Sequence, residues 1–204
     1  MKKSTSLLLT LALLGILNSA YSQTAEQFYN LGIKKYQQND YSGSIKEFDK
    51  AIKLKPTYSD AYVLRGNSKL YLNDSTGAIS DCNKAISLNP DNTDAYTCRG
   101  SINLYFKNYN KAIQDYSKAI ELDPKDIDAY FPRGSAEMAI RDYTNALKDF
   151  NEAIKLNPQY GQAYYGRGEL KALLGDTESA CSDLKKAGNL GIPIANIEAK
   201  KYCK

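Results

Sequence analysis

Histidine and tryptophan are absent from the 204-residue sequence, and methionine occurs only twice. Without histidine, the chain lacks the commonest general base and the commonest metal-binding side chain. The four cysteines include no Cys-x-x-Cys pair. The sequence also lacks a phosphate-binding loop, a nucleophile elbow and a dinucleotide fingerprint. These absences argue against an enzyme and against any bound cofactor or metal.

An excess of one charge is also missing. Lysine and arginine number 27 against 23 acidic residues, which gives a net charge of +4. Opposite charges are interleaved along the chain, a pattern typical of solvated helix faces. A balance so close to neutral gives no electrostatic reason to expect a nucleic-acid partner.

The apolar run near the N-terminus, residues 7–17, is only 11 residues long. Two lysines precede it, and the small residues Ala20 and Ser22 follow it. This pattern predicts a secretory signal peptide, residues 1–22, cleaved after Ser22. The alternative is an uncleaved anchor, but 11 residues are too few to span a bilayer comfortably. Cleavage would leave an exported protein of charge 25 − 23 = +2, without stable membrane insertion.

The sequence does contain a strict period of 34 residues. Five glycines recur at that interval: Gly32, Gly66, Gly100, Gly134 and Gly168. Four prolines follow the same interval: Pro56, Pro90, Pro124 and Pro158. An aromatic residue precedes each glycine by four positions: Phe28, Tyr62, Tyr96, Tyr130 and Tyr164. A single phase held for so long identifies a repeat array.

These columns resemble the tetratricopeptide repeat, a helix-turn-helix unit, over residues 25 to about 194. The resemblance implies an all-α, right-handed superhelical solenoid of five units plus a C-terminal capping helix. The expected domain, 23–194, divides into units 25–58, 59–92, 93–126, 127–160 and 161–194, followed by the cap at 195–204. Helix pairs are expected at 26–38 with 42–54, 60–72 with 76–88, 94–107 with 110–121, 128–140 with 144–155, and 162–174 with 178–188.

Three aspartates stand at the expected start of a first helix: Asp60, Asp94 and Asp128. Aspartate is a preferred N-cap, and its charge favours the positive end of the helix dipole. We therefore expect these side chains to cap their helices. Contact with a ligand is the alternative.

Two further columns carry opposite charges. Arginines precede four of the glycines: Arg65, Arg99, Arg133 and Arg167. Acids occupy one column of the second helices: Glu47, Asp81, Asp115, Asp149 and Asp183. We expect each acid to pair with the arginine of the next unit, since the first unit has Leu31 in the arginine column and no acid before it. Pairing within a unit is the alternative. Either way the pairs predict a structural ladder.

The four cysteines allow two disulfides in an exported chain. Because adjacent helices are antiparallel, Cys181 and Cys203 are expected at the same level along the two helix axes. We therefore expect a disulfide between them that holds the terminal helix against the last repeat helix. Cys82 and Cys98 also lie at similar height. Because Cys82 occupies a core column usually filled by an aromatic residue, the sequence leaves that bond undecided, with buried thiols as the alternative.

In the family that the repeats resemble, first helices line a concave groove that binds peptides or protein segments. The corresponding residues here are Tyr29, Tyr36, Asn67, Tyr71, Ser101, Tyr105, Phe131 and Tyr165. The same face also carries Asn30, Leu70, Thr97, Leu104, Ser135, Met138, Glu169 and Leu173. Tyrosine suits recognition because it buries a large area and keeps a polar tip. Packing between neighbouring helices is the alternative for each aromatic residue.

The sequence thus predicts a non-enzymatic interaction module whose partner is a protein or peptide. The resemblance extends to small exported bacterial proteins, which implies a periplasmic or secreted location. A self-assembling scaffold and a glycan- or peptidoglycan-binding accessory remain alternatives. A weak hydrolase would require two of the scattered carboxylates to form an acid/base pair.

Overall fold

The computed structural model describes residues 24–203, and the predicted signal peptide, residues 1–22, lies outside them. Within the described range the chain forms eleven helices and no strand. None of these helices is both long enough and apolar enough to cross a membrane. The protein is therefore an all-α array.

The helices form five antiparallel pairs and a closing helix. The first helices of the pairs are α2 (Ala25–Gln37), α4 (Ser59–Tyr71), α6 (Thr93–Tyr105), α8 (Ile127–Ala139) and α10 (Gly161–Leu173). The second helices are α3 (Tyr41–Leu54), α5 (Ser75–Leu88), α7 (Tyr109–Leu122), α9 (Tyr143–Leu156) and α11 (Thr177–Asn189), and the array closes with α12 (Pro193–Tyr202). Every helix begins and ends within two residues of its predicted range.

The periodic glycines lie where the two helices of a pair cross. A Cβ atom on Gly32 would stand 2.5 Å from the ring of Phe48, and one on Gly100 would stand 3.1 Å from the ring of Tyr116. Both rings are completely buried. The glycine column therefore provides the space that a side chain of the second helix fills, and this side chain is aromatic in three of the five units.

The three aspartates expected to cap first helices do not cap them. Asp60, Asp94 and Asp128 are each the second residue of their helix. Asn92 caps α6 by accepting a hydrogen bond from the amide of Ala95, and Asp126 caps α8. The prediction was wrong because each helix begins two residues before the position that capping by these aspartates would require, which leaves the carboxylates free to face other groups.

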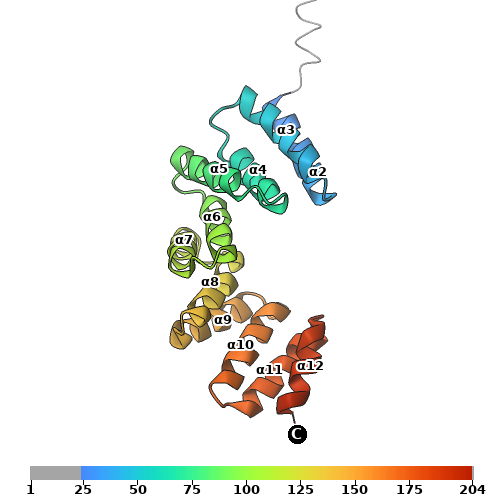
Figure 1. Cartoon of the computed structure of the whole chain (residues 1–204), viewed down its shortest axis with the longest axis vertical. Coiled ribbons are helices and arrows are strands. Elements are labelled where there is room, and N and C mark those ends of the chain that lie inside the picture. Colours follow the sequence, from blue (N-terminus) through green and yellow to red (C-terminus); the bar gives the residue numbers. More distant parts are fainter. Residues whose placement is uncertain (1–23, 204) are drawn as a thin grey trace, which may run out of the picture.

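The pairs stack into a curved solenoid (Figure 1). Each first helix contacts the next first helix along the array, whereas no comparable packing joins successive second helices. Closer spacing on one side makes that side the inner surface. The first helices therefore line the concave face.

Candidate partner-binding groove

Five of the predicted groove residues line one cavity of about 460 Å³. They come from three successive first helices: Tyr36 on α2, Asn67 and Tyr71 on α4, and Ser101 and Tyr105 on α6. Residues 34 apart lie on equivalent positions of neighbouring units. The repeat thereby assembles one surface from side chains distant in sequence.

The tyrosines of this cavity are held by other rings while remaining open to solvent. Tyr71 is 58% exposed, and its ring stacks on Tyr41 at 4.3 Å with 3° between the planes. Tyr36 approaches Tyr71 edge-on at 5.9 Å. Tyr105 is 66% exposed and contacts Phe106 edge-on at 5.1 Å. Such supported aromatic surfaces lose little entropy when they bind a partner.

The other three predicted aromatics pack between helices. Tyr29 stacks on Tyr58 at 4.7 Å, and Phe131 lies against a core cluster. Tyr165 packs against the cluster that includes Leu184 of α11 and Ala195 of α12, and its hydroxyl donates a hydrogen bond to Glu169 of its own helix at 2.7 Å. These contacts support the alternative of structural packing for Tyr29, Phe131 and Tyr165.

A second cavity, of about 350 Å³, adjoins the first. The two cavities share Tyr36, Asn67 and Ser101. The second also contains three carboxylates: Asp94, Asp126 and Asp128. One continuous groove therefore has an aromatic part and an acidic part. Sequence reasoning assigned Asp94 and Asp128 to capping and missed Asp126.

The carboxylates of the acidic part are close enough to affect one another. Partial burial, and then the charges of Asp60 and Asp128, raise the pKa of Asp94, although its side chain still reaches solvent. Burial raises the pKa of Asp126 as well, against the opposing effect of a hydrogen bond from the Asp128 amide. Within residues 24–203 no lysine or arginine forms an ion pair with Asp60, Asp94, Asp126 or Asp128.

A third cavity, of about 640 Å³, lies on the same face near the C-terminus. Its lining includes Ser135, Met138, Glu169, Leu173, Glu198 and Tyr202. The last two belong to α12 and were missed because a repeat pattern does not orient a helix outside the repeat. Cys181 and Cys203 are bonded, with an S–S distance of 2.04 Å, and this bond holds the end of α12 against α11.

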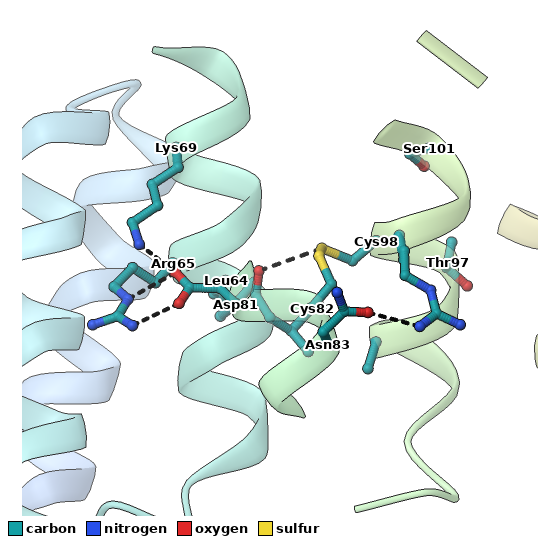
Figure 2. Close-up of a disulfide and its surroundings, with 12 residues drawn as sticks. Leu64, Arg65, Lys69, Asp81, Cys82, Asn83, Thr97, Cys98 and Ser101 are labelled. Atoms are coloured by element: carbon teal, nitrogen blue, oxygen red, sulfur yellow. Dashed lines mark hydrogen bonds and ion pairs between the residues drawn. A yellow bond between two sulfur atoms is a disulfide. The ribbon is translucent and has the colours of Figure 1, made fainter. Parts of the chain in front are cut away.

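Cys82 and Cys98 form the second disulfide, which joins α5 to α6. Figure 2 shows this bond inside the array. Thr97 and Ser101 of the groove lie on the same helix as Cys98, and the Arg65–Asp81 pair lies in the unit that contains Cys82. The bond that the sequence left undecided is therefore present in the structure, and it links the groove-lining helix α6 to the preceding unit.

The charged ladder exists, but in the other register. The arginines pair with the acid of their own unit: Arg65–Asp81, Arg99–Asp115, Arg133–Asp149 and Arg167–Asp183. In the first of these, Nε and Nη2 donate to the two carboxylate oxygens at 2.8 and 2.6 Å. The prediction that each acid pairs with the next unit was wrong, because the guanidinium reaches across to the antiparallel helix of its own pair.

Each arginine also reaches back to the preceding unit. The Nη1 atoms donate to Asp49, Asn83, Ser117 and Asn151, each 16 residues before its arginine. The first unit has no predecessor, which explains Leu31, and its Glu47 pairs with Lys35 and Lys50 instead. The arginines thus join successive units and are not available to bind an acidic ligand.

One ladder position breaks the pattern. Glu137 lies beside Asp149, and the two are only 7% and 4% exposed. Among the described residues the Oε2 atom of Glu137 has no hydrogen-bond partner. Burial, and then the Asp149 charge, raise the pKa of Glu137 to about 7. A hydrolase would need such a carboxylate pair. However, both groups are buried and Arg133 donates two hydrogen bonds to Asp149, which favours a structural role.

The repeat columns and this helical arrangement are matched by two family models. The model described as "TPR repeat" matches residues 34–70, 103–140 and 134–175, and the one described as "Tetratricopeptide repeat" matches residues 59–92. The chain belongs to the tetratricopeptide repeat family. Members of this family are scaffolds for protein–protein interaction. No curated protein is significantly similar to this chain in sequence.

Many solved structures share the fold. A crystal structure of MamA is 24% identical with a TM-score of 0.68, over 81% of this chain and 96% of that one. YrrB, described as "a TPR protein with an unusual peptide-binding site", is 23% identical with a TM-score of 0.67, over 87% and 92%. PilW, described as a type IV pilus biogenesis factor, is 19% identical with a TM-score of 0.76, over 83% and 78%. These likenesses establish the tetratricopeptide solenoid fold.

Proposed function

We propose that this tetratricopeptide chain is a non-enzymatic scaffold that binds a peptide or protein segment in its concave groove. The observation that carries the proposal is the cavity shared by α2, α4 and α6, where Tyr71 and Tyr105 are mostly exposed although each is supported by a neighbouring ring. Exposed aromatic side chains in a concave surface are typical anchors for a partner.

We further propose that the protein works outside the cytoplasm, in the periplasm or as a secreted protein. Two observations support this location. The N-terminal 22 residues have the pattern of a signal peptide, and both pairs of cysteines are bonded. Structural disulfides persist in oxidising compartments and are rare in the cytosol.

The test is a pull-down from an envelope extract of the source cells, with residues 23–204 as bait and both disulfides intact. The bait is compared with a Tyr71→Ala/Tyr105→Ala variant. Leu54→Ala is the matched control, since Leu54 is 55% exposed at the end of a second helix, outside the concave face. A protein captured by the wild type and the control but lost from the double variant supports the groove.

Other results would point elsewhere. Equal capture by all three baits would move the binding site to another face. Recovery of the bait alone would favour the self-assembling scaffold. Binding of purified cell-wall glycan with no protein present would favour the glycan-binding accessory, in which tyrosine rings stack on sugars.

A further inference from the structure

We propose that the concave groove selects a cationic segment, in which lysine or arginine side chains stand next to apolar or aromatic ones. The inference rests on the proposed groove function and adds the chemistry of the partner. It follows from how charge is distributed between the faces of the array.

The three cavities on the first-helix face contain only one sign of charge. Their charged lining residues are Asp94, Asp126, Asp128, Glu169 and Glu198. No lysine or arginine is among the residues that line them. Two cavities elsewhere on the described chain contain both signs, with Arg99, Lys111 and Asp115 in one and Arg133, Lys148 and Asp149 in the other. The cavities of the first-helix face are therefore set apart by the absence of positive charge from their lining.

This acidity is not a consequence of overall composition, because the whole chain carries a net charge of +4. The first helices do contain cations, but most of them bind acids of the ladder. Three lysines pair with acids of the second helices: Lys35–Glu47 at 3.3 Å, Lys69–Asp81 at 2.7 Å and Lys171–Asp183 at 2.8 Å. The fourth, Lys34 of α2, is exposed and lines none of the three cavities. The arginines are bound in the same ladder. The fold thus sorts positive charge away from the groove and leaves negative charge inside it.

Two carboxylates of the acidic part, Asp94 and Asp128, occupy an equivalent position in successive units, and Asp60 occupies that position in the unit before them, outside the cavity lining. Asp60, Asp94 and Asp128 stand 34 residues apart, each at the second residue of a first helix. Their mutual repulsion contributes to the raised pKa of Asp94. A bound ammonium or guanidinium group would relieve that repulsion, whereas an acidic segment would increase it.

The geometry also indicates what accompanies the cation. Asn67 and Ser101 line both the acidic and the aromatic cavity, so a single segment can occupy the two together. Its cationic side chain would enter beside Asp94. The neighbouring apolar side chain would then lie against Tyr71 and Tyr105, and a second cation could stack on these ring faces.

The test measures binding by fluorescence anisotropy with residues 23–204 and both disulfides intact. The probe is a labelled eight-residue peptide that alternates lysine with phenylalanine and has blocked ends. Two matched peptides replace lysine with glutamine or with glutamate. The variant is Asp94→Asn/Asp128→Asn, and the control is Asp91→Asn/Glu121→Gln, which changes the net charge equally at exposed sites outside the cavities.

We expect the lysine peptide to bind at least about tenfold more tightly than the glutamate peptide at low salt. The Asp94→Asn/Asp128→Asn variant should lose about tenfold of that affinity, and the control less than about twofold. Added salt should weaken binding of the lysine peptide by the wild type more than by the variant, because partly exposed charges are screened.

Failure of this inference can be separated from failure of the groove itself. Equal binding of the lysine and glutamine peptides, lost in Tyr71→Ala/Tyr105→Ala, would overturn the cationic preference and keep the groove. Binding unaffected by either double variant would overturn both. The inference would be overturned if the folded chain did not bind the lysine peptide. It would also be overturned if the chain self-associated and Asp94→Asn/Asp128→Asn abolished that association, because a second copy would then occupy the groove.

Discussion

Glu137 should make the protein less stable as the pH rises toward neutrality. Its position on α8 is equivalent to positions that supply a hydrogen-bond donor to the ladder acid in the other units. Those residues are Lys35, Lys69, Asn103 and Lys171. Glu137 instead places a second carboxyl group beside Asp149, with one oxygen lacking a partner among the described residues.

The magnitude follows from the shift in protonation. The pKa of Glu137 rises from 4.5 to about 7 in the folded state, where the neutral form is favoured. Between these values the folded chain binds more protons than the unfolded chain, so the free energy of unfolding falls as the pH increases. The full shift in the pKa corresponds to a decrease of about 3 kcal/mol in the free energy of unfolding between pH 4.5 and pH 7.

Two substitutions test this reasoning. Glu137→Gln removes the ionisation, so the variant should match the wild type at pH 5 and exceed it in stability at pH 8 by about 2–3 kcal/mol. Glu137→Lys should restore the pairing seen between Lys69 and Asp81 at 2.7 Å, and it should stabilise the chain at pH 8 by a similar amount.

The assay is urea unfolding followed by circular dichroism at both pH values. Glu152→Gln serves as control, since Glu152 pairs with Lys155 at the surface of the neighbouring helix, and it should change stability by less than about 0.5 kcal/mol at either pH. The reasoning is refuted if the wild type and Glu137→Gln change in parallel between pH 5 and pH 8.

Three further substitutions test the packing. Asp115→Ala would leave the guanidinium of Arg99 without its buried carboxylate, and urea unfolding should show a loss of roughly 3–5 kcal/mol; a loss below 1 kcal/mol would mean that the ladder is dispensable. Gly32→Ala would force a Cβ against Phe48, so its thermal midpoint should fall with a loss of about 1–3 kcal/mol despite the better helix propensity of alanine, and an unchanged midpoint would contradict the close crossing. Cys203→Ser opens a loop whose ends are 22 residues apart; we expect a loss of about 3 kcal/mol and faster amide exchange in α12, and unchanged exchange would show that the helix docks without the bond.

The helices of this protein could be placed from the sequence because one 34-residue pattern is repeated five times. Glycine, an aromatic residue and alanine recur wherever helices cross closely, and proline ends each of the first four units. Such steric requirements depend on residue size and are local, so helix bounds were predictable to within two residues. The tyrosine and polar residues at the equivalent groove positions of α4 and α6 could be found for the same reason.

The tertiary structure decided which side chains meet. A period places Arg65 on a helix, but only the antiparallel packing shows that it reaches Asp81 of its own unit and Asp49 of the unit before. Because α6 begins at Thr93 and is capped by Asn92, Asp94 is a groove carboxylate and not the expected cap. Glu198 entered the third cavity because α12 folds back onto the array. Long side chains cover distances greater than the spacing between repeats, so their contacts depend on helix geometry that sequence spacing alone does not specify.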